Sequence, residues 1–347
     1  MRILSPHCGV DAETTSGGAV FERELLRRLA EKHDVHILTT RRARDRAPTA
    51  PWTIHATHAT HGLTWWTAPF MLLDRMRDLP RPDLLRVHSL RIIGPSALYA
   101  RRVFWPGVPI VAHHHHLDGR RNPIERFVSD RMDRVIVGSE FAKRQMRERG
   151  WRTDHVRVVP YAVDERFQPV DRSGRVNVIV LFLGGLKKRK NVDLLLRIWP
   201  EVARACPNAI LRIAGDGPER AKLERMARGM PRVSFAGYVA EKQKPQVYQD
   251  ADVFAFPSHM EGFGLPALEA MASGLPVLVS ANGSLPELVE VSSVCRSDGE
   301  MWHKLAWLCE RGDVRRRKGE SARHISEGYS WERCVRETEA VYEEVLR

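Results

Sequence analysis

The sequence predicts an α/β protein built from two doubly wound domains, and three observations support this. Short apolar runs alternate with longer amphipathic segments along nearly the whole chain, a pattern typical of βαβ units around a parallel sheet. The alternation forms two series, separated by residues 166–175, whose Pro, Gly and Ser content indicates a linker. The length of 347 residues also suggests two domains at ~150 residues each. We therefore expect domains at residues 1–170 and 171–330.

The first series holds the strand-like runs of the N-terminal domain, at 3–4, 35–39, 84–88, 110–114, 135–137 and 156–159. Helical patterns between some of them cover 19–32 and 142–149. The apolar residues in these helical patterns are spaced by three and four positions, as on one helix face.

The second series has strand-like runs at 178–183, 210–214, 233–235, 253–256 and 277–279, with helical patterns at 192–205, 219–228 and 266–272. A last helix is predicted at 331–347, and we expect it to pack back onto the first domain. Ligands of doubly wound sheets bind beyond the carboxyl ends of the strands. We therefore expect the two domains to face each other across a deep cleft that holds the site.

The composition is that of an ordinary globular chain, with 43% hydrophobic and 28% charged residues, which excludes a wholly disordered protein. The longest nearly apolar run, 178–186, is half the ~20 residues that cross a bilayer. The strand-like start at residues 1–4 predicts no signal peptide. Five scattered cysteines without a C-x-x-C pair favour a reducing, cytoplasmic compartment.

The chain is basic, with a net charge of +12. Residues 1–170 contribute +9 and the remainder +3. Phosphorylated ligands, anionic lipid headgroups and nucleic acid are all compatible partners for such a charge. A solvated surface rich in arginine explains the charge equally well.

The segment PSHMEGFGLPALEAM, residues 257–271, carries the strongest chemical signal. Glu261 precedes the glycine-rich Gly262-Phe263-Gly264, and a helix pattern opens at Leu265, with a proline in its first turn. Glycines allow a ligand to approach the backbone closely, and the N-terminus of a helix attracts phosphate. Glu269 follows one turn inside the helix. Two carboxylates around such a turn suit sugar hydroxyls bound beside a phosphate group.

This segment resembles the E-x7-E signature of the retaining glycosyltransferases of family 4, which have the GT-B fold. The resemblance continues over most of the chain. It covers a Gly-Gly loop at 16–19, a strand ending in the active-site His at 109–115, a "VDxxxF" element shortened by one residue at 163–167, a "GRLxxxK" turn at 182–190, "L-x-I-x-G-x-G-P" at 211–218, "GG-x-PE" at 280–287 and "F-S-W" at 329–331.

The resemblance implies roles for individual residues. Glu261 would contact hydroxyls of the donor sugar beside the amides of Phe263 and Gly264. The Leu265 amide would meet the diphosphate, and Glu269 would bind the ribose. Lys190 would bind the diphosphate as a point charge. Finally, Gly18 would let the first domain close over the donor, and His115 would lie against the transferred sugar.

One position departs from the family pattern. The arginine that accompanies Lys190 in the "GRLxxxK" turn is replaced by Gly185, which removes a bidentate phosphate ligand. Lys187, Lys188 and Arg189 are candidates for its replacement, although none occupies the motif position.

The histidine run 113–116 leaves its register open. Alignment on Pro109 makes His115 the active-site histidine, whereas a slip of one residue would select His114 or His116. In a strand, the first and third histidines point one way and the second and fourth the other. His116 is therefore a candidate for the acceptor side, as is His88 at the end of a predicted strand. His55, His58 and His61 recur in what reads as a loop without cysteine or carboxylate partners, so we predict no metal site.

The acceptor side is the least informative region. Trp65 and Trp66 precede an apolar stretch at 69–73, and Arg75, Arg77, Arg81 and Arg86 follow it. This pattern suits either peripheral contact with an anionic membrane, at the inner face, or a helix packed on the core.

The resemblance implies a retaining glycosyltransferase that moves a sugar from a nucleoside diphosphate sugar to an acceptor hydroxyl. The acceptor would attack from the side on which the diphosphate departs, with no metal or other cofactor. The alternatives are a GT-B nucleotide-sugar epimerase or phosphorylase, and a basic protein that binds membranes or nucleic acid. Nucleic acid is disfavoured as a partner because no recognised binding motif is present. A dinucleotide oxidoreductase lacks the required G-x-G-x-x-G spacing.

Overall fold

The computed structural model describes residues 1–6, 17–57, 73, 75–115 and 123–347. The chain forms two compact units, the first comprising residues 1–161 and 331–347 and the second residues 162–330. The boundary follows Tyr161 instead of the predicted position after residue 170. The segment after Tyr161 belongs to the second unit because its side chains bind there: Arg172 Nε donates to the Ala251 carbonyl at 2.7 Å, and Phe167 packs edge-on against Tyr248.

The first unit is built on a seven-stranded parallel sheet with the order β3-β2-β1-β4-β5-β6-β7. Its strands are β1 (Arg2–Pro6), β2 (Asp34–Thr39), β3 (Thr53–Ala56), β4 (Leu84–Val87), β5 (Ile110–His113), β6 (Arg134–Val137) and β7 (Val156–Val158). The edge strand β3 was not predicted, and it places His55 in a strand where the sequence suggested a loop. There the Nε2 of His55 meets the Nδ1 of His36 on β2 at 2.8 Å.

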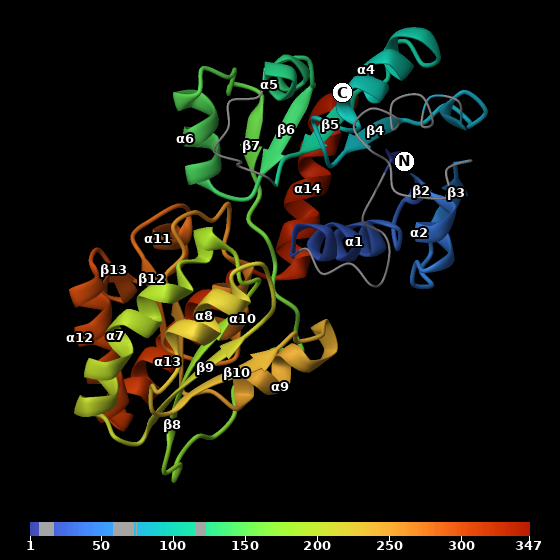
Figure 1. The fold of residues 1–347 in the computed structure, drawn as a ribbon. Coiled ribbons are helices and arrows are strands. Elements are labelled where there is room, and N and C mark those ends of the chain that lie inside the picture. Colours follow the sequence, from blue (N-terminus) through green and yellow to red (C-terminus); the bar gives the residue numbers. More distant parts are fainter. Residues whose placement is uncertain (7–16, 58–72, 74, 116–122) are drawn as a thin grey trace. The chain divides into compact units, whose positions relative to one another are not determined.

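The helices of the first unit are α1 (Gly17–Leu29), α2 (Arg41–Asp45), α4 (Gly94–Val103), α5 (Pro123–Ser129), α6 (Glu140–Glu148) and α14 (Trp331–Leu346). Figure 1 shows α1 and α14 side by side, and the two helices are in contact. Helix α6 begins after Ser139, whose hydroxyl caps it by accepting from the Ala142 amide at 3.1 Å.

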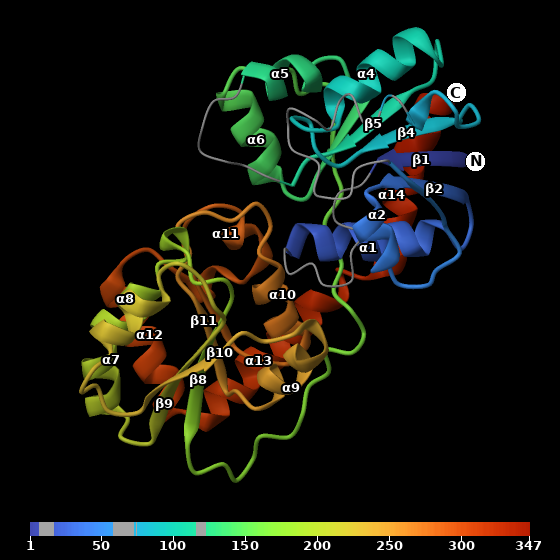
Figure 2. The same cartoon turned by 45° about the vertical axis from the view of Figure 1, so that its right-hand side comes forward.

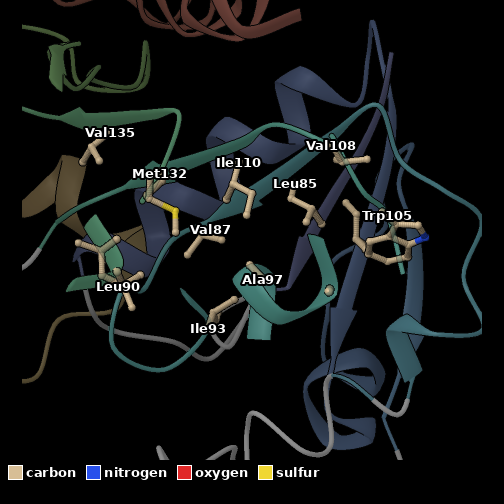
Figure 3. Packing of buried hydrophobic residues seen from close by; sticks show 14 of the residues in the cluster. Leu85, Val87, Leu90, Ile93, Ala97, Trp105, Val108, Ile110, Met132 and Val135 are labelled. Carbon is tan, nitrogen blue, oxygen red and sulfur yellow. The ribbon is translucent and has the colours of Figure 1, made fainter. Parts of the chain in front are cut away.

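Strand alternation gives the two faces of this sheet different character. Leu85, Val87, Ile110 and Ala112 join Ile93 and Ala97 of α4, Val128 of α5 and Met146 of α6 in one apolar cluster, part of which Figure 3 shows. Arg86, between Leu85 and Val87, and His113, after Ala112, point to the opposite face of the sheet, where both are buried.

A buried polar network occupies that opposite face. Arg86, which is fully buried, forms an ion pair with Glu22 of α1 at 2.6 Å. The hydroxyl of Tyr342 on α14 accepts from Arg86 Nε at 3.0 Å and meets His113 Nε2 at 2.9 Å. The last helix of the chain is therefore fastened to the first sheet by side-chain hydrogen bonds.

The second unit has a six-stranded parallel sheet with the order β10-β9-β8-β11-β12-β13. The strands are β8 (Val178–Leu183), β9 (Ala209–Ala214), β10 (Val233–Gly237), β11 (Val253–Phe256), β12 (Val277–Ser280) and β13 (Val294–Cys295). The helices are α7 (Val192–Ala205), α8 (Arg220–Met226), α9 (Lys244–Gln249), α10 (Leu265–Ala272), α11 (Leu285–Leu288), α12 (Asp298–Glu310) and α13 (Gly312–Glu327), with one-turn 3₁₀ helices η1 (Lys188–Lys190), η2 (Glu241–Gln243) and η3 (Val291–Ser293).

The order of strands positions the site of this unit. Strand β8 lies between β9 and β11. The chain adds β9 and β10 on one side of β8 and then crosses back to add β11 on its other side, so the order of strands reverses at β8. Such a switch point is where ligands of doubly wound sheets bind, beyond the carboxyl ends of the strands. The turns after β8 and β11 carry Lys190 and Glu261.

Among the described residues, no helix is long and apolar enough to span a membrane.

Replacing Tyr342 with Phe should destabilise the first unit, because Arg86 and His113 would each lose a buried hydrogen-bond partner. We expect a cost of about 1–3 kcal/mol, measured by urea unfolding. Tyr99→Phe is the matched control, because the Tyr99 side chain is exposed and the change should be nearly neutral. Equal stabilities of the two variants would contradict the fastening role of Tyr342.

Candidate functional site

Glycines shape the turn that leads from β8 to Lys190. A Cβ atom at Gly215, whose φ is +133°, would lie 1.9 Å from the Gly184 carbonyl oxygen. The loops after β8 and β9 can therefore approach this closely only with glycine at that position. Past this contact, η1 carries Lys190 into a buried position.

The carboxylate of Glu261 is the centre of the polar site in the second unit. Its Oε1 accepts from Lys190 Nζ at 2.7 Å, from Arg189 Nη1 at 3.0 Å and from Ser258 Oγ at 2.6 Å. No hydrogen bond from a described residue reaches its Oε2. Three donors and burial, with only 7% of Glu261 exposed, hold the carboxylate rigidly. Its second oxygen remains available to a ligand.

Burial also affects the lysine partner. The pKa of Lys190 lies below its usual value because burial disfavours the ammonium, although Glu261 opposes this shift. The ammonium also lies 4.5 Å from the centre of the Phe256 ring. Two residues predicted for separate roles, Lys190 and Glu261, are thus in direct contact.

The backbone of Glu261 is gripped by the loop after β12. Ser284 donates to the Glu261 carbonyl through both its amide and its hydroxyl, each at 3.1 Å. Gly283 approaches so closely that a Cβ there would lie 2.7 Å from the Glu261 nitrogen. The predicted "GG-x-PE" turn therefore positions the first carboxylate.

Helix α10 begins at Leu265 after a left-handed glycine. Gly264 is the N-cap residue with φ of 104°, and an added Cβ would lie 2.6 Å from Cδ2 of Leu285. The Ala267 amide is bonded to the Gly264 carbonyl at 2.9 Å, so the amides of Gly264 and Leu265 lie ahead of the first helical hydrogen bond. Helix N-termini with such amides attract anions.

Glu269 lies inside the same helix and is held by two side chains from α9. The hydroxyl of Tyr248 donates to its Oε2 at 2.8 Å, and Lys244 Nζ donates to its Oε1 at 3.2 Å. Burial raises the pKa of the Glu269 carboxyl, against the opposing effect of Lys244. Each carboxylate oxygen keeps further lone pairs for a ligand hydroxyl.

Gly185 is exposed, and its backbone has no left-handed conformation. Of the three cations that the sequence offered in place of the missing arginine, the structure brings Arg189 to Glu261. The Arg189 guanidinium also donates to the Met260 carbonyl at 2.7 Å and is about half exposed. Arg189 and Lys190 therefore share one carboxylate oxygen, leaving excess positive charge beside the N-terminus of α10.

His115 is the focus of the polar groups in the first unit. Its Nε2 meets Glu22 Oε1 at 2.6 Å, and its Nδ1 meets the Tyr161 hydroxyl. An ionised carboxylate only accepts, so Nε2–H donates to Glu22 and, in a neutral ring, Nδ1 accepts from Tyr161. A Cβ at Gly18 would lie 3.6 Å from the His115 Cβ, so these two predicted residues are neighbours.

The alternation predicted for the histidine run is present in the structure. His113 Nδ1 faces the same Glu22 oxygen at 3.6 Å, whereas the His114 ring lies 5.6 Å from the Trp151 ring on the other side. His88 hydrogen-bonds the Pro6 carbonyl through Nδ1 at 3.0 Å, and burial lowers its pKa to about 4. His116 lies outside the described residues.

Glu22, His113 and His115 form the one trio of described residues with the spacing of metal ligands. Arg86 already neutralises the carboxylate at 2.6 Å. Burial alone raises the pKa of Glu22, but Arg86 and the histidines outweigh it and hold the pKa well below its usual value. A divalent cation would add charge to a buried group that already has a cationic partner, so the residues present fit an ion pair better than a metal.

The prediction that Arg86 belongs to a basic surface that contacts a membrane is wrong. Its side chain is fully buried against Glu22 and does not reach a surface. Trp65, Trp66 and residues 69–72 lie outside the described residues, as do His58, His61 and Ser16.

Sequence reasoning missed the partners of the predicted site residues. Glu22 could have been found, because it falls on the apolar stripe of its helix with Leu25, Leu26 and Leu29 and an acid there needs a partner. Tyr161, Ser258, Tyr248 and Lys244 carry no such signal, because their roles depend on tertiary contacts.

Two protein-family models match this chain. The model for "Glycosyl transferases group 1" matches residues 177–313. The model for "Glycosyltransferase Family 4" matches residues 15–167. Each model thus falls largely within one of the two units.

Solved structures show the same fold. Sucrose-phosphate synthase from Thermosynechococcus elongatus aligns with a TM-score of 0.86 at 19% identity, covering 99% of this chain and 98% of that one. The Anabaena protein HepE in complex with UDP-glucose aligns with a TM-score of 0.78 at 17% identity, covering 98% and 99%. The fold is therefore GT-B, with two Rossmann-like domains.

Sequence relatives identify the family. A D-inositol 3-phosphate glycosyltransferase from Saccharomonospora viridis is 31% identical over 303 residues, covering 75% of this chain and 70% of that protein. A GDP-mannose-dependent α-(1-6)-phosphatidylinositol dimannoside mannosyltransferase from Mycobacterium tuberculosis is 31% identical over 216 residues, and the alignment spans 55% of its length. The chain belongs to glycosyltransferase family 4, which confirms the resemblance drawn from its motifs.

Gly264→Ala should disturb the site more than an ordinary glycine substitution. The left-handed backbone alone costs a non-glycine residue about 1–2 kcal/mol, and the new methyl group would press on Leu285. We expect a lower melting temperature and weaker nucleotide binding. Gly185→Ala is the control, because its Cβ would meet only ordinary contacts, the nearest at 3.8 Å. Equal behaviour of the two variants would contradict the proposed constraint on the start of α10.

Proposed function

We propose that the protein is a retaining glycosyltransferase that moves a sugar from a nucleoside diphosphate sugar to an acceptor hydroxyl. The observation that carries this proposal is the placement of Glu261, Lys190 and Glu269 around the N-terminus of α10. Family membership and the GT-B fold support it independently.

The donor would lie along the carboxyl edge of the second sheet. The free Oε2 of Glu261 would accept hydrogen bonds from sugar hydroxyls, while Lys190 and the Leu265 amide would bind the diphosphate. Phe263, Gly262 and Gly264 would line the backbone side of this pocket. Glu269, one turn deeper in α10, would accept from the ribose hydroxyls.

The mechanism needs no protein base. Both ring nitrogens of His115 are engaged by Glu22 and Tyr161, so this histidine contributes shape rather than proton transfer. We infer that the acceptor hydroxyl passes its proton to a departing phosphate oxygen as the new bond forms on the same face of the sugar. The chain would supply positioning and positive charge for the leaving diphosphate, a role that Lys190 and the amides of α10 can fill without a metal ion.

The nucleotide of the donor can be identified by a binding experiment. Among relatives and structural neighbours, one uses GDP-mannose and one was solved with UDP-glucose. A thermal-shift screen with UDP, GDP, ADP and dTDP, and then their sugar conjugates, would name it, because a ligand of the folded state raises the melting temperature.

The two glutamates should separate in their effects. Glu261→Gln should lower turnover about 100-fold or more, by analogy with loss of one transition-state contact, yet preserve the thermal shift with the nucleoside diphosphate because Lys190 and Arg189 remain. Glu269→Ala should instead weaken nucleotide binding about 10-fold, the scale of one charged hydrogen bond. Unchanged turnover in Glu261→Gln, or no thermal shift with any nucleotide, would refute the proposed function.

Arg189 should replace the missing arginine of the motif. Arg189→Ala should weaken binding of the nucleoside diphosphate about 10-fold and leave the nucleoside unaffected, because only the diphosphate meets the lost charge. Adding Gly185→Arg to that variant should restore binding, since position 185 has space for a side chain. Lys188→Ala is the control from the same exposed turn. A loss in the control equal to that in Arg189→Ala would assign the effect to general charge.

A further inference from the structure

Large apolar side chains gather on the outside of two helices in the first unit. Of the nine large hydrophobic side chains that are exposed in the described part of the chain, four lie on α4 and α5: Tyr99 (51% exposed), Val103 (50%), Ile124 (44%) and Phe127 (53%). The other five are spread over separate elements: Val176, Tyr238, Val291, Trp307 and Leu346. Exposed apolar side chains are ordinary when single, but a group of them marks an interaction site.

The two helices pack against each other where α4 begins. They are so close that a Cβ added to Gly94 at the start of α4 would lie 2.3 Å from Cγ1 of Val128 on α5, and both views show them as neighbours (Figures 1 and 2). Their inner residues, such as Ala97 and Val128, belong to the apolar cluster of the sheet. The four exposed side chains therefore lie on the opposite, outer sides of the same helices.

Arginines are interleaved with these apolar groups. Arg101 and Arg102 lie between Tyr99 and Val103 in the sequence, and the Arg131 guanidinium lies 3.5 Å from the centre of the Phe127 ring. Acidic groups are present too: Asp133 pairs with Arg101 at 2.8 Å and Asp130 with Arg126 at 3.7 Å. The two helices and the turn after α5, residues 94–103 and 123–131, nevertheless hold four arginines against two acidic residues, a net +2.

We propose that the outer surface of α4 and α5 docks on an anionic phospholipid bilayer. The apolar tips would enter the boundary between headgroups and acyl chains, while long arginine side chains reach lipid phosphates. Tyrosine and arginine suit this boundary because each has an apolar body and a polar end. The charge of the segment matches an anionic surface, for which each basic residue near the membrane contributes about 1 kcal/mol.

This surface is separate from the stretch that the sequence suggested, of which Arg86 is buried. Helix α5 follows β5 in the chain, and β5 leads into His115. If the transferase function holds, a bilayer bound at α5 would favour an amphiphilic acceptor held in the membrane. The docking itself does not depend on that function.

The test is co-sedimentation of the full chain with vesicles of phosphatidylcholine alone or mixed with phosphatidylglycerol, at low and high salt. We expect binding only to the mixed vesicles, weaker at high salt. Tyr99→Ser combined with Phe127→Ser should reduce binding about tenfold or more, because two apolar side chains no longer enter the lipid. Arg102→Glu should also reduce it, with the apolar groups intact.

Val176→Ser combined with Val291→Ser is the control, because it removes two apolar side chains of the second unit that are even more exposed than Tyr99 and Phe127. This pair should bind vesicles like the unchanged protein. Melting temperatures within a few degrees of the unchanged protein would establish that the variants are folded. Failure of the unchanged protein to bind mixed vesicles at low salt, or equal losses in the two paired variants, would overturn the proposal. Neither readout requires a sugar donor, so a failed docking surface is distinguishable from a failed transferase.

Discussion

The ion pair between Glu22 and Arg86 is the interaction on which the polar interior of the first unit depends. A buried arginine is costly without a compensating anion, and a buried carboxylate is equally costly without a cation. With the two groups 2.6 Å apart, their charges neutralise each other, and the second carboxylate oxygen binds His115. The orientation of that histidine is therefore a consequence of a charge balance formed by α1 and β4.

The second unit also depends on a buried carboxylate paired with cations, but there one carboxylate oxygen stays available to a ligand. There Glu261 is the anion, and two cations and a hydroxyl converge on a single oxygen. The remaining oxygen is oriented but not consumed, which is the condition for ligand recognition without rearrangement. In both units a buried carboxylate fixes the groups around it. In the second unit, Oε2 of Glu261 accepts no hydrogen bond from a described residue and is available to a ligand near the start of α10.

Most of the fold could be predicted because buried parallel strands are apolar runs and the helices between them are amphipathic. Strand β3 was missed because an edge strand with the sequence TIHA has little apolar character. The boundary was misplaced because linker-like residues such as Arg172 gain their binding partners only in the folded chain. The sequence selected Gly264, Lys190 and Glu261 from their motifs, and the structure places the last two in direct contact, a pairing that the motifs did not predict. The site was not predictable at Tyr161 or Tyr248, whose hydroxyls matter only through contacts distant in sequence.

The fastening of α14 to the first sheet has a consequence for synthesis on the ribosome. Tyr342 emerges only after the whole second unit, yet it hydrogen-bonds Arg86 and His113 in the first. Until then Arg86 has its ion-pair partner Glu22 on α1 but lacks the Tyr342 hydroxyl, as does His113. The second unit is one continuous segment, residues 162–330, so it can complete its sheet before the last helix is synthesised. We therefore expect the two halves of the chain to mature out of their order in the sequence, with the N-terminal unit completed last because it needs residues 331–347.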